Sequence, residues 1–218
     1  DGFSLDNQPP EFYTGLGSRL LFQAPVRPNF PNQFAPILYS EIWGDYWGYF
    51  SVSATDTRTS THLNGRDLTD LLATGSRPSW LETNYYAMRG YLGRVNLVSL
   101  LPSALALISI GLAAAAALSR QNSLAWLPGQ RSMYSFLLLA ICTTMLGYYW
   151  FLIMFPRLDK GGDTIKATYL LHLFPFVAVM VGFALKHVEE KSQLLYRLLI
   201  GMLCVVCLHN AAAMVSHY

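Results

Sequence analysis

Four long apolar stretches in the second half of the chain limit what it can fold into. They are Val95–Leu118, Tyr134–Phe155, Thr168–Leu185 and Leu198–Ser216, each 18 to 24 residues long and without an Asp, Glu, Lys or Arg. An α-helix rises about 1.5 Å per residue, so each stretch is long enough to cross a hydrocarbon layer of about 30 Å. The pattern predicts four transmembrane helices.

The alternative is a large helical core inside a soluble protein. A soluble helix of this length carries a polar stripe on the face that meets water, and these stretches have none. Hydrophobic residues make up 53% of the chain and charged residues 13%, against about 25% charged in ordinary globular domains. We therefore expect an all-α membrane protein.

The organisation predicted from the sequence is a polar loop region over residues 1–92 and a transmembrane bundle over 93–218. Six prolines in the first 36 residues argue against long helices there. Residues 34–50 (FAPILYSEIWGDYWGYF) crowd aromatic rings together, and such rings suit the lipid headgroup layer. We expect a short interfacial helix or re-entrant turn in this segment.

The chain begins at Asp1 with no initiator Met and no signal-like segment. We expect further transmembrane helices upstream, which would make this sequence part of a larger bundle.

Orientation does not follow from charge, because the loops on each side carry five Lys or Arg residues. We place residues 1–92 outside the cytoplasm, since a long aromatic loop beside a short basic one suits an extracytoplasmic binding face. The expected location is a multi-pass position in a membrane, the cytoplasmic membrane if the source is prokaryotic.

The loop from Pro156 to Ala167 (PRLDKGGDTIKA) carries the most chemistry of the short loops. It combines a glycine pair with Arg157, Lys160 and Lys166, and Asp163 or Thr164 is placed to cap the following helix. A helix N-terminus beside three cations suits a phosphate group. Ordinary anchoring and capping is the competing interpretation.

Several polar residues fall inside the spans. Lys166, Tyr169 and His172 share one face of the third span, and Pro175 is expected to remove a backbone hydrogen bond midway along it. His172 and the pair His209-Asn210 are candidates first for interhelical hydrogen bonds and then for functional groups. We further expect the alanine run at 113–117 to face protein, and Lys186–Arg197 to form a small amphipathic helix between spans.

Asp45, in the run WGDYWG, is a weak candidate for a catalytic base, with Glu41 four residues before it. A carboxylate shielded by aromatic rings would have a raised pKa and could accept a proton. A solvated acid in an interfacial loop is the competing interpretation.

Metal and cofactor signals are weak. Cys142, Cys204 and Cys207 all fall inside spans, without a neighbouring His or acid that would complete a metal site. We assign no metal ligand and no cofactor; a divalent metal has no support in the sequence. No nucleotide-binding or nucleic-acid-binding motif occurs, and no nucleic-acid partner is expected.

The Trp-Gly-aromatic core IWGDYWGYF, followed by spans and by a basic loop that opens onto TYLLHLFPFVAVM, resembles the C-terminal part of GT-C class membrane glycosyltransferases. These enzymes use polyprenyl-phosphate sugars; their branches include mannosyltransferase-like and aminoarabinose-transferase-like proteins. Tyr169-Leu170-Leu171 and Pro175 fit the family's helix motif, whereas Ala167-Thr168 stand where a basic residue is expected.

The resemblance implies transfer of a sugar from a lipid-phosphate donor to an extracytoplasmic acceptor. Arg157, Lys160 and Lys166 would bind the lipid phosphate, while Trp43, Tyr46, Trp47 and Tyr169 would cover the substrate. The family's catalytic aspartate belongs to an N-terminal half that this sequence does not contain. Two alternatives remain: a transporter or flippase whose pathway is lined by His172, Pro175, His209 and Asn210, and a non-catalytic subunit of a membrane complex.

Overall fold

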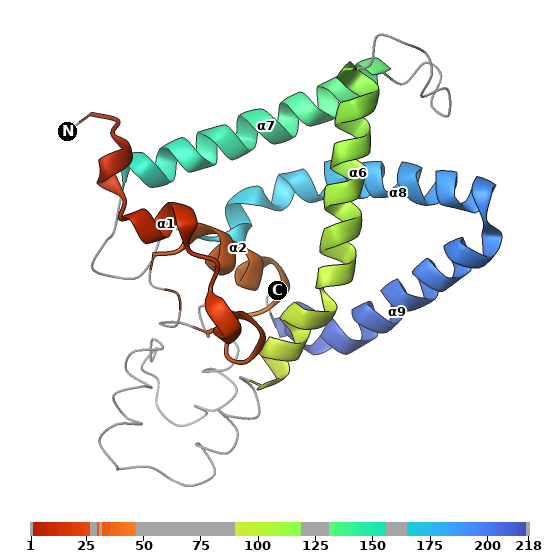
Figure 1. Cartoon of the computed structure of the whole chain (residues 1–218), viewed down its shortest axis with the longest axis horizontal. Helices are drawn as coiled ribbons and strands as arrows, with labels where there is room; N and C mark the ends of the chain where they lie inside the picture. The colour runs from red at the N-terminus through yellow and green to blue at the C-terminus, as the bar shows by residue number, and fades with distance from the viewer. Residues whose placement is uncertain are drawn as a thin grey trace, which may run out of the picture. The chain divides into compact units, whose positions relative to one another are not determined.

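The computed structural model describes residues 2–26, 30, 32–46, 90–118, 131–155 and 165–216, and every secondary-structure element in these ranges is a helix. Four helical segments are long and apolar enough to cross a membrane: Gly90–Leu118, Arg131–Met154, Ala167–Lys191 and Gln193–Ala213. The prediction of an all-α membrane protein with four spans is confirmed (Figure 1).

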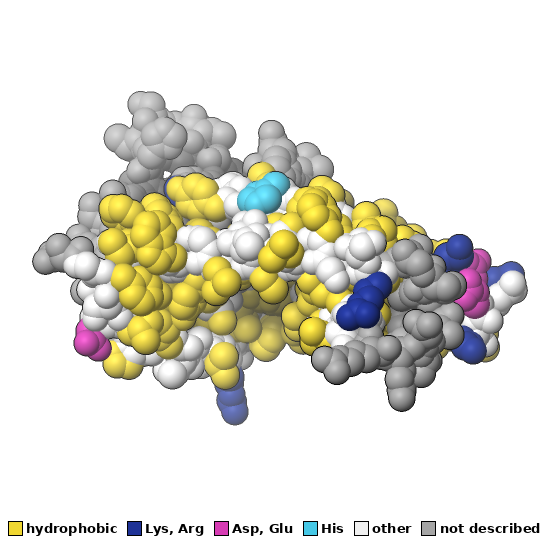
Figure 2. All heavy atoms as spheres, turned by 90° about the horizontal axis from the view of Figure 1, so that it is seen from above, with side chains coloured by type: hydrophobic (Ala, Val, Ile, Leu, Met, Phe, Trp, Pro, Cys, Tyr) yellow, Lys and Arg dark blue, Asp and Glu magenta, His cyan; other side chains and the backbone are white. Residues whose placement is uncertain are grey.

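The surfaces of the four spans are mostly apolar and uncovered. Between 11 and 22% of the most hydrophobic window of each span is buried inside the protein. Large side chains such as Leu107, Leu146 and Leu208 are about 70% exposed or more, and Figure 2 shows one face covered mainly by hydrophobic side chains. Soluble monomers rarely expose contiguous apolar patches of this extent. These observations support a multi-pass membrane protein.

The chain divides into two compact units. The first comprises Asp1–Ser99, Leu152–Ala167 and Leu208–Tyr218, and the second comprises Leu100–Phe151 and Thr168–Cys207. The first unit therefore contains the start of the first span, the end of the second, the approach to the third and the end of the fourth. Spans that alternate in direction bring these ends to one face of a bilayer. The grouping fits the predicted shared surface, while its extracytoplasmic location stays a prediction.

The first unit begins with short helices, as its prolines predict. They are η1 (Leu5–Asn7), α1 (Pro10–Thr14), η2 (Ser18–Phe22) and α2 (Phe34–Trp43), where η denotes a 3-10 helix. The Ser4 hydroxyl caps η1 by accepting a hydrogen bond from the Asp6 N–H at 3.2 Å. The predicted segment 34–50 is thus helical as far as Trp43, and its positions 47–50 lie outside the described ranges.

The second unit contains α6 (Leu100–Leu118) and α8 (Phe174–Lys191), together with α7 (Arg131–Met154) up to Phe151 and α9 (Gln193–Ser216) up to Cys207. Its core is a cluster of Ala113, Tyr134, Leu137 and Met180, and α6 crosses α8 (Figure 1). Ala113 is 2% exposed, because a small side chain lets two helix backbones approach closely. The prediction that the alanine run faces protein is confirmed at Ala113, while Ala115 is exposed.

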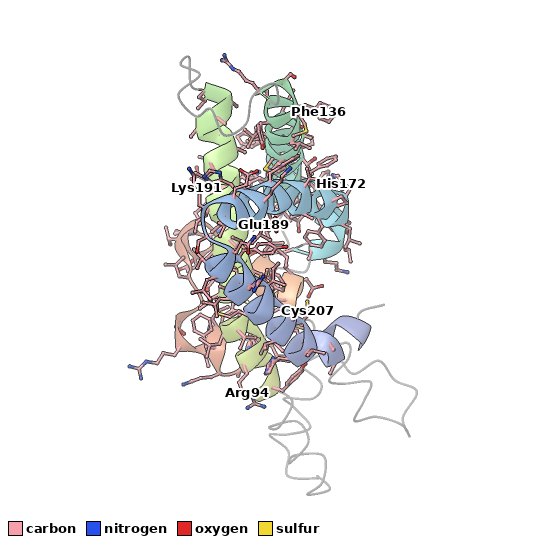
Figure 3. All side chains as sticks on the ribbon, turned by 90° about the vertical axis from the view of Figure 1, so that its right-hand side faces the viewer. Arg94, Phe136, His172, Glu189, Lys191 and Cys207 are labelled. Carbon is pink, nitrogen blue, oxygen red and sulfur yellow. The ribbon has the colours of Figure 1, made fainter. Side chains whose placement is uncertain are left out.

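Two predictions about the third and fourth spans are wrong. A separate amphipathic helix over Lys186–Arg197 does not form, because α8 continues to Lys191 and only Ser192 separates it from α9. Glu189 and Lys191 project from the last turns of α8 (Figure 3). Pro175 also does not interrupt a continuous α-helix, because the preceding residues form the 3-10 helix η4 (Ala167–Leu173) and Pro175 lies in the first turn of α8. Proline lacks a backbone N–H, and the N–H groups in the first turn of an α-helix have no partner within the helix. The missing group therefore breaks no hydrogen bond of α8.

The three native cysteines test the membrane assignment. Cys142, Cys204 and Cys207 are exposed on the helices, so lipid is what would shield them from water. We expect a membrane-impermeant maleimide to leave all three unmodified in sealed vesicles and to modify all three after denaturation in SDS. A Glu11→Cys variant, on exposed α1, is the positive control in vesicles of the matching orientation. Labelling of the native thiols at the control's rate would contradict membrane insertion.

Candidate functional site

Several polar side chains of the first unit lie where α2 packs against the helical residues 90–98, which precede α6. The Asn96 amide nitrogen donates to the Leu21 carbonyl and to the Ser40 hydroxyl, each at 3.0 Å. The Tyr39 hydroxyl donates to the Asn96 carbonyl at 2.7 Å. Asn96 and Ser40 are both completely buried. One carboxamide therefore joins η2, α2 and the first span.

Glycine permits this close packing. A Cβ atom added to Gly93 would clash with the backbone carbonyl of Phe22 at the end of η2. Leu92 and Val95, on either side of it, are completely buried and complete the contact. The start of the first span is thus fixed against the N-terminal region by backbone approach as well as by hydrogen bonds.

The N-terminal segment binds the end of α7 in the same way. The Asn7 amide donates to the Ile153 carbonyl at 3.2 Å, and the Gln8 amide donates to the Leu152 carbonyl at 2.5 Å. Asn32 in turn donates to the Gln8 side-chain oxygen at 2.8 Å. The last carbonyls of a helix have no partner within the helix, so these two amides cap the C-terminus of α7.

A third set of contacts ties α9 to the first span. The Asn210 amide donates to the Ser99 hydroxyl at 2.8 Å, and its oxygen lies 2.8 Å from Nδ1 of His209. The Tyr91 hydroxyl donates to the His209 carbonyl at 2.8 Å. The prediction that Asn210 forms an interhelical hydrogen bond is confirmed.

The acidic and aromatic residues predicted for the site lie at the end of α2. Asp45 is completely buried and Glu41 is 8% exposed, so the interpretation of Asp45 as a solvated surface acid is wrong. Trp43 is half-buried. Tyr46 is completely buried: its ring stacks on Phe30 at 5.8 Å, and its hydroxyl donates to the Phe30 carbonyl at 3.3 Å.

The three aromatic residues predicted to cover the substrate in this segment differ in how accessible they are. Tyr46 serves the core of the first unit, and its covering role stays a prediction, as does that of Trp43. Trp47 lies outside the described residues.

Of the predicted phosphate-binding residues, only Lys166 lies within the described ranges; Arg157 and Lys160 fall outside them. Lys166 is half-buried between Ile165 and Ala167, which are both buried. The predicted capping residues Asp163 and Thr164 also lie outside the described ranges, so only the helix after them can be described. It begins as η4, a 3-10 helix, and the N-cap of α8 is Leu173, without a side-chain hydrogen bond.

Tyr169 and His172 lie in the second unit, on η4. Tyr169 contacts Tyr148 and Phe151 of α7, at ring distances of 5.7 and 6.2 Å. His172 Nε2 lies 3.2 Å from the Thr144 hydroxyl, which confirms its predicted role as an interhelical hydrogen-bond partner. Tyr169 is 51% exposed, and His172 projects outward from the ribbon in Figure 3. The structure assigns His172 and Pro175 to the second unit and His209 and Asn210 to the first.

The sequence analysis missed the carboxamides that hold the first unit together. Asn96 is a polar residue near the start of an otherwise apolar span, and such residues usually bond to a neighbouring helix. Asn7, Gln8 and Asn32 lie in a polar stretch, where nothing in the sequence distinguishes a buried amide from a solvated one.

Comparison with known protein families, with curated proteins and with solved structures finds no match. A function can therefore be inferred only from the sequence and the contacts of the chain itself.

Replacing Asn96 with Ala should destabilise the first unit. The change removes two donated hydrogen bonds and leaves the partly buried Leu21 carbonyl without this donor, a loss of about 1–3 kcal/mol. Leu97→Ala is the matched control, because Leu97 is adjacent and 51% exposed. Thermal unfolding in detergent should show a clearly lower Tm for Asn96→Ala than for Leu97→Ala. Equal Tm values would show that Asn96 does not hold the unit together.

Proposed function

We propose that the chain is the C-terminal part of an integral-membrane glycosyltransferase that moves a sugar from a polyprenyl-phosphate donor to an extracytoplasmic acceptor. One observation carries the proposal. The first unit brings the segment Trp43–Tyr46 and the lead-in to the third span, with Lys166, into one compact body. An acceptor or sugar site and a phosphate site would have to lie in one body, although Lys166 and Tyr46 are 120 positions apart in the sequence.

Phosphate binding is assigned to the basic loop. Lys166, together with Arg157 and Lys160, would contact the lipid phosphate through charge-assisted hydrogen bonds, which are about twice as strong as neutral ones. A half-buried lysine fits this role, because its apolar stem can lie along the unit while its ammonium group reaches the headgroup layer.

Sugar contact is assigned to aromatic residues. Trp43, in the first unit, is half-buried and leaves part of its ring accessible to a sugar. Trp47 would extend this contact, and buried Tyr46 would hold the segment in place from the core. Tyr169, a half-exposed ring of the second unit, is a separate candidate contact. The buried carboxyl group of Asp45 is the candidate base within this chain, while the main catalytic aspartate would come from a preceding region.

The phosphate assignment predicts the behaviour of a lysine variant. We expect Lys166→Ala to weaken binding of polyprenyl phosphate about 10-fold, since a hydrogen bond to a charged group contributes about 1.5–3 kcal/mol. Binding to the dephosphorylated polyprenol should not change. Arg157→Ala should act in the same direction, and its effect on the donor should appear as a higher KM in the complete enzyme.

Arg19→Ala is the control, because Arg19 is an exposed cation of the same unit on η2. The measurement is quenching of intrinsic tryptophan fluorescence by spin-labelled lipid in vesicles doped with either compound. Equal affinities of wild type, Lys166→Ala and Arg19→Ala for polyprenyl phosphate would remove Lys166 from the site.

A further inference from the structure

A buried oxygen atom of the first unit lacks a hydrogen-bond partner. Asn96 is completely buried, and its Oδ1 accepts no hydrogen bond from the part of the chain that the structure describes. An unsatisfied buried acceptor costs about 1–3 kcal/mol. Such an atom in a native structure calls for an unseen partner, which is a water molecule or an ion.

The orientation of the Asn96 amide is fixed by its neighbours. The Leu21 carbonyl can only accept a hydrogen bond, and it lies 3.0 Å from the amide nitrogen. Rotating the amide by 180° would set two oxygen atoms against each other. The atom without a partner is therefore the oxygen. Its partner must be a hydrogen-bond donor or a cation, because an amide oxygen is only an acceptor.

This oxygen faces the C-terminal end of α2. It lies 3.5 Å from the position that a Cβ atom of Gly44 would take. Gly44 is followed directly by Asp45 and lies three residues after Glu41, and both acids are buried. The end of a helix also carries about half a negative charge on its last carbonyl groups. The buried oxygen of Asn96, which lacks a hydrogen-bond donor, thus lies at a helix end that favours a positively charged partner.

We propose that an oxygen-preferring divalent cation, of the calcium or magnesium type, binds at the end of α2. Its ligands are Oδ1 of Asn96 and the carboxylates of Asp45 and Glu41, with water completing the coordination. Hard cations take carboxylate and amide oxygens as ligands. The described residues contain no group of three or more His, Cys, Asp or Glu placed for a metal, so the described part of the chain supplies two anionic ligands at most. We expect a Kd of about 10⁻⁴–10⁻³ M, the range of extracellular calcium modules.

The cation site does not require the proposed sugar transfer, although Asp45 would not be free to act as a base while it binds the cation. The test contains no donor lipid. Tb³⁺, which replaces Ca²⁺ and emits when a nearby tryptophan is excited, is titrated into the purified full chain in detergent. Trp43 immediately precedes Gly44, so Trp43→Phe should lower the sensitised emission at saturation without changing the affinity. Added Ca²⁺ should displace the Tb³⁺.

The ligand assignment is tested with isosteric variants. Asp45→Asn and Glu41→Gln should each weaken Tb³⁺ binding at least 10-fold, whereas Asp6→Asn and Glu11→Gln, which change exposed acids of the same unit, should not. Circular dichroism checks that each variant folds.

Three results would overturn the proposal. They are the absence of saturable Tb³⁺ binding to the wild type, saturable binding whose emission is unaffected by Trp43→Phe, and equal weakening by the buried and the exposed acid changes. In the first case a water molecule is the partner of Oδ1.

Discussion

The first unit depends on satisfying polar backbone groups at helix ends, in surroundings where water is scarce. An exposed helix end bonds to solvent at no net cost, but the ends of these spans are buried beneath the N-terminal segment. Asn7 and Gln8 supply donors to the last carbonyls of α7, and Asn96 supplies donors to η2 and α2. A carboxamide is suited to this position because it carries two donors without a charge, and so avoids the larger desolvation cost of burying an ion.

The helices of the second unit are held together by different interactions. Between apolar helices in lipid there is no hydrophobic driving force, so close packing and occasional polar contacts hold them together. Ala113 provides the close approach of α6 and α8, and the Arg131 Nε group donates to the Ala117 carbonyl at 2.9 Å, closing the connection between α6 and α7. The low burial of the spans is the expected result of such sparse contacts. Lipid or further helices cover what the chain leaves exposed.

The sequence predicts the spans well, because their length and lack of charge are properties of each segment alone. It predicts their ends poorly. The observed helices α7, α8 and α9 include Arg131, Lys191 and Arg197, which lie outside the predicted spans. Long basic side chains extend toward the interface and are tolerated in terminal turns. The first unit is harder still, since its contacts join residues such as Gln8 and Leu152, 144 positions apart. Neither periodicity nor composition encodes such a pairing, and neither predicts that Asp45 is buried.

Pro175 shows how one residue fixes the position of others at a distance. In a continuous α-helix its ring would clash with the carbonyl four residues earlier, and the residue before it would disfavour the α conformation. The preceding segment winds instead as the 3-10 helix η4. With three residues per turn, positions three apart are superimposed, so Tyr169 and His172 point to the same side. There they meet the stripe of Thr144, Tyr148 and Phe151, which recur at helical spacing along α7. The same proline therefore marks where the α-helical part of the span begins, and the 3-10 helix before it aligns Tyr169 with His172.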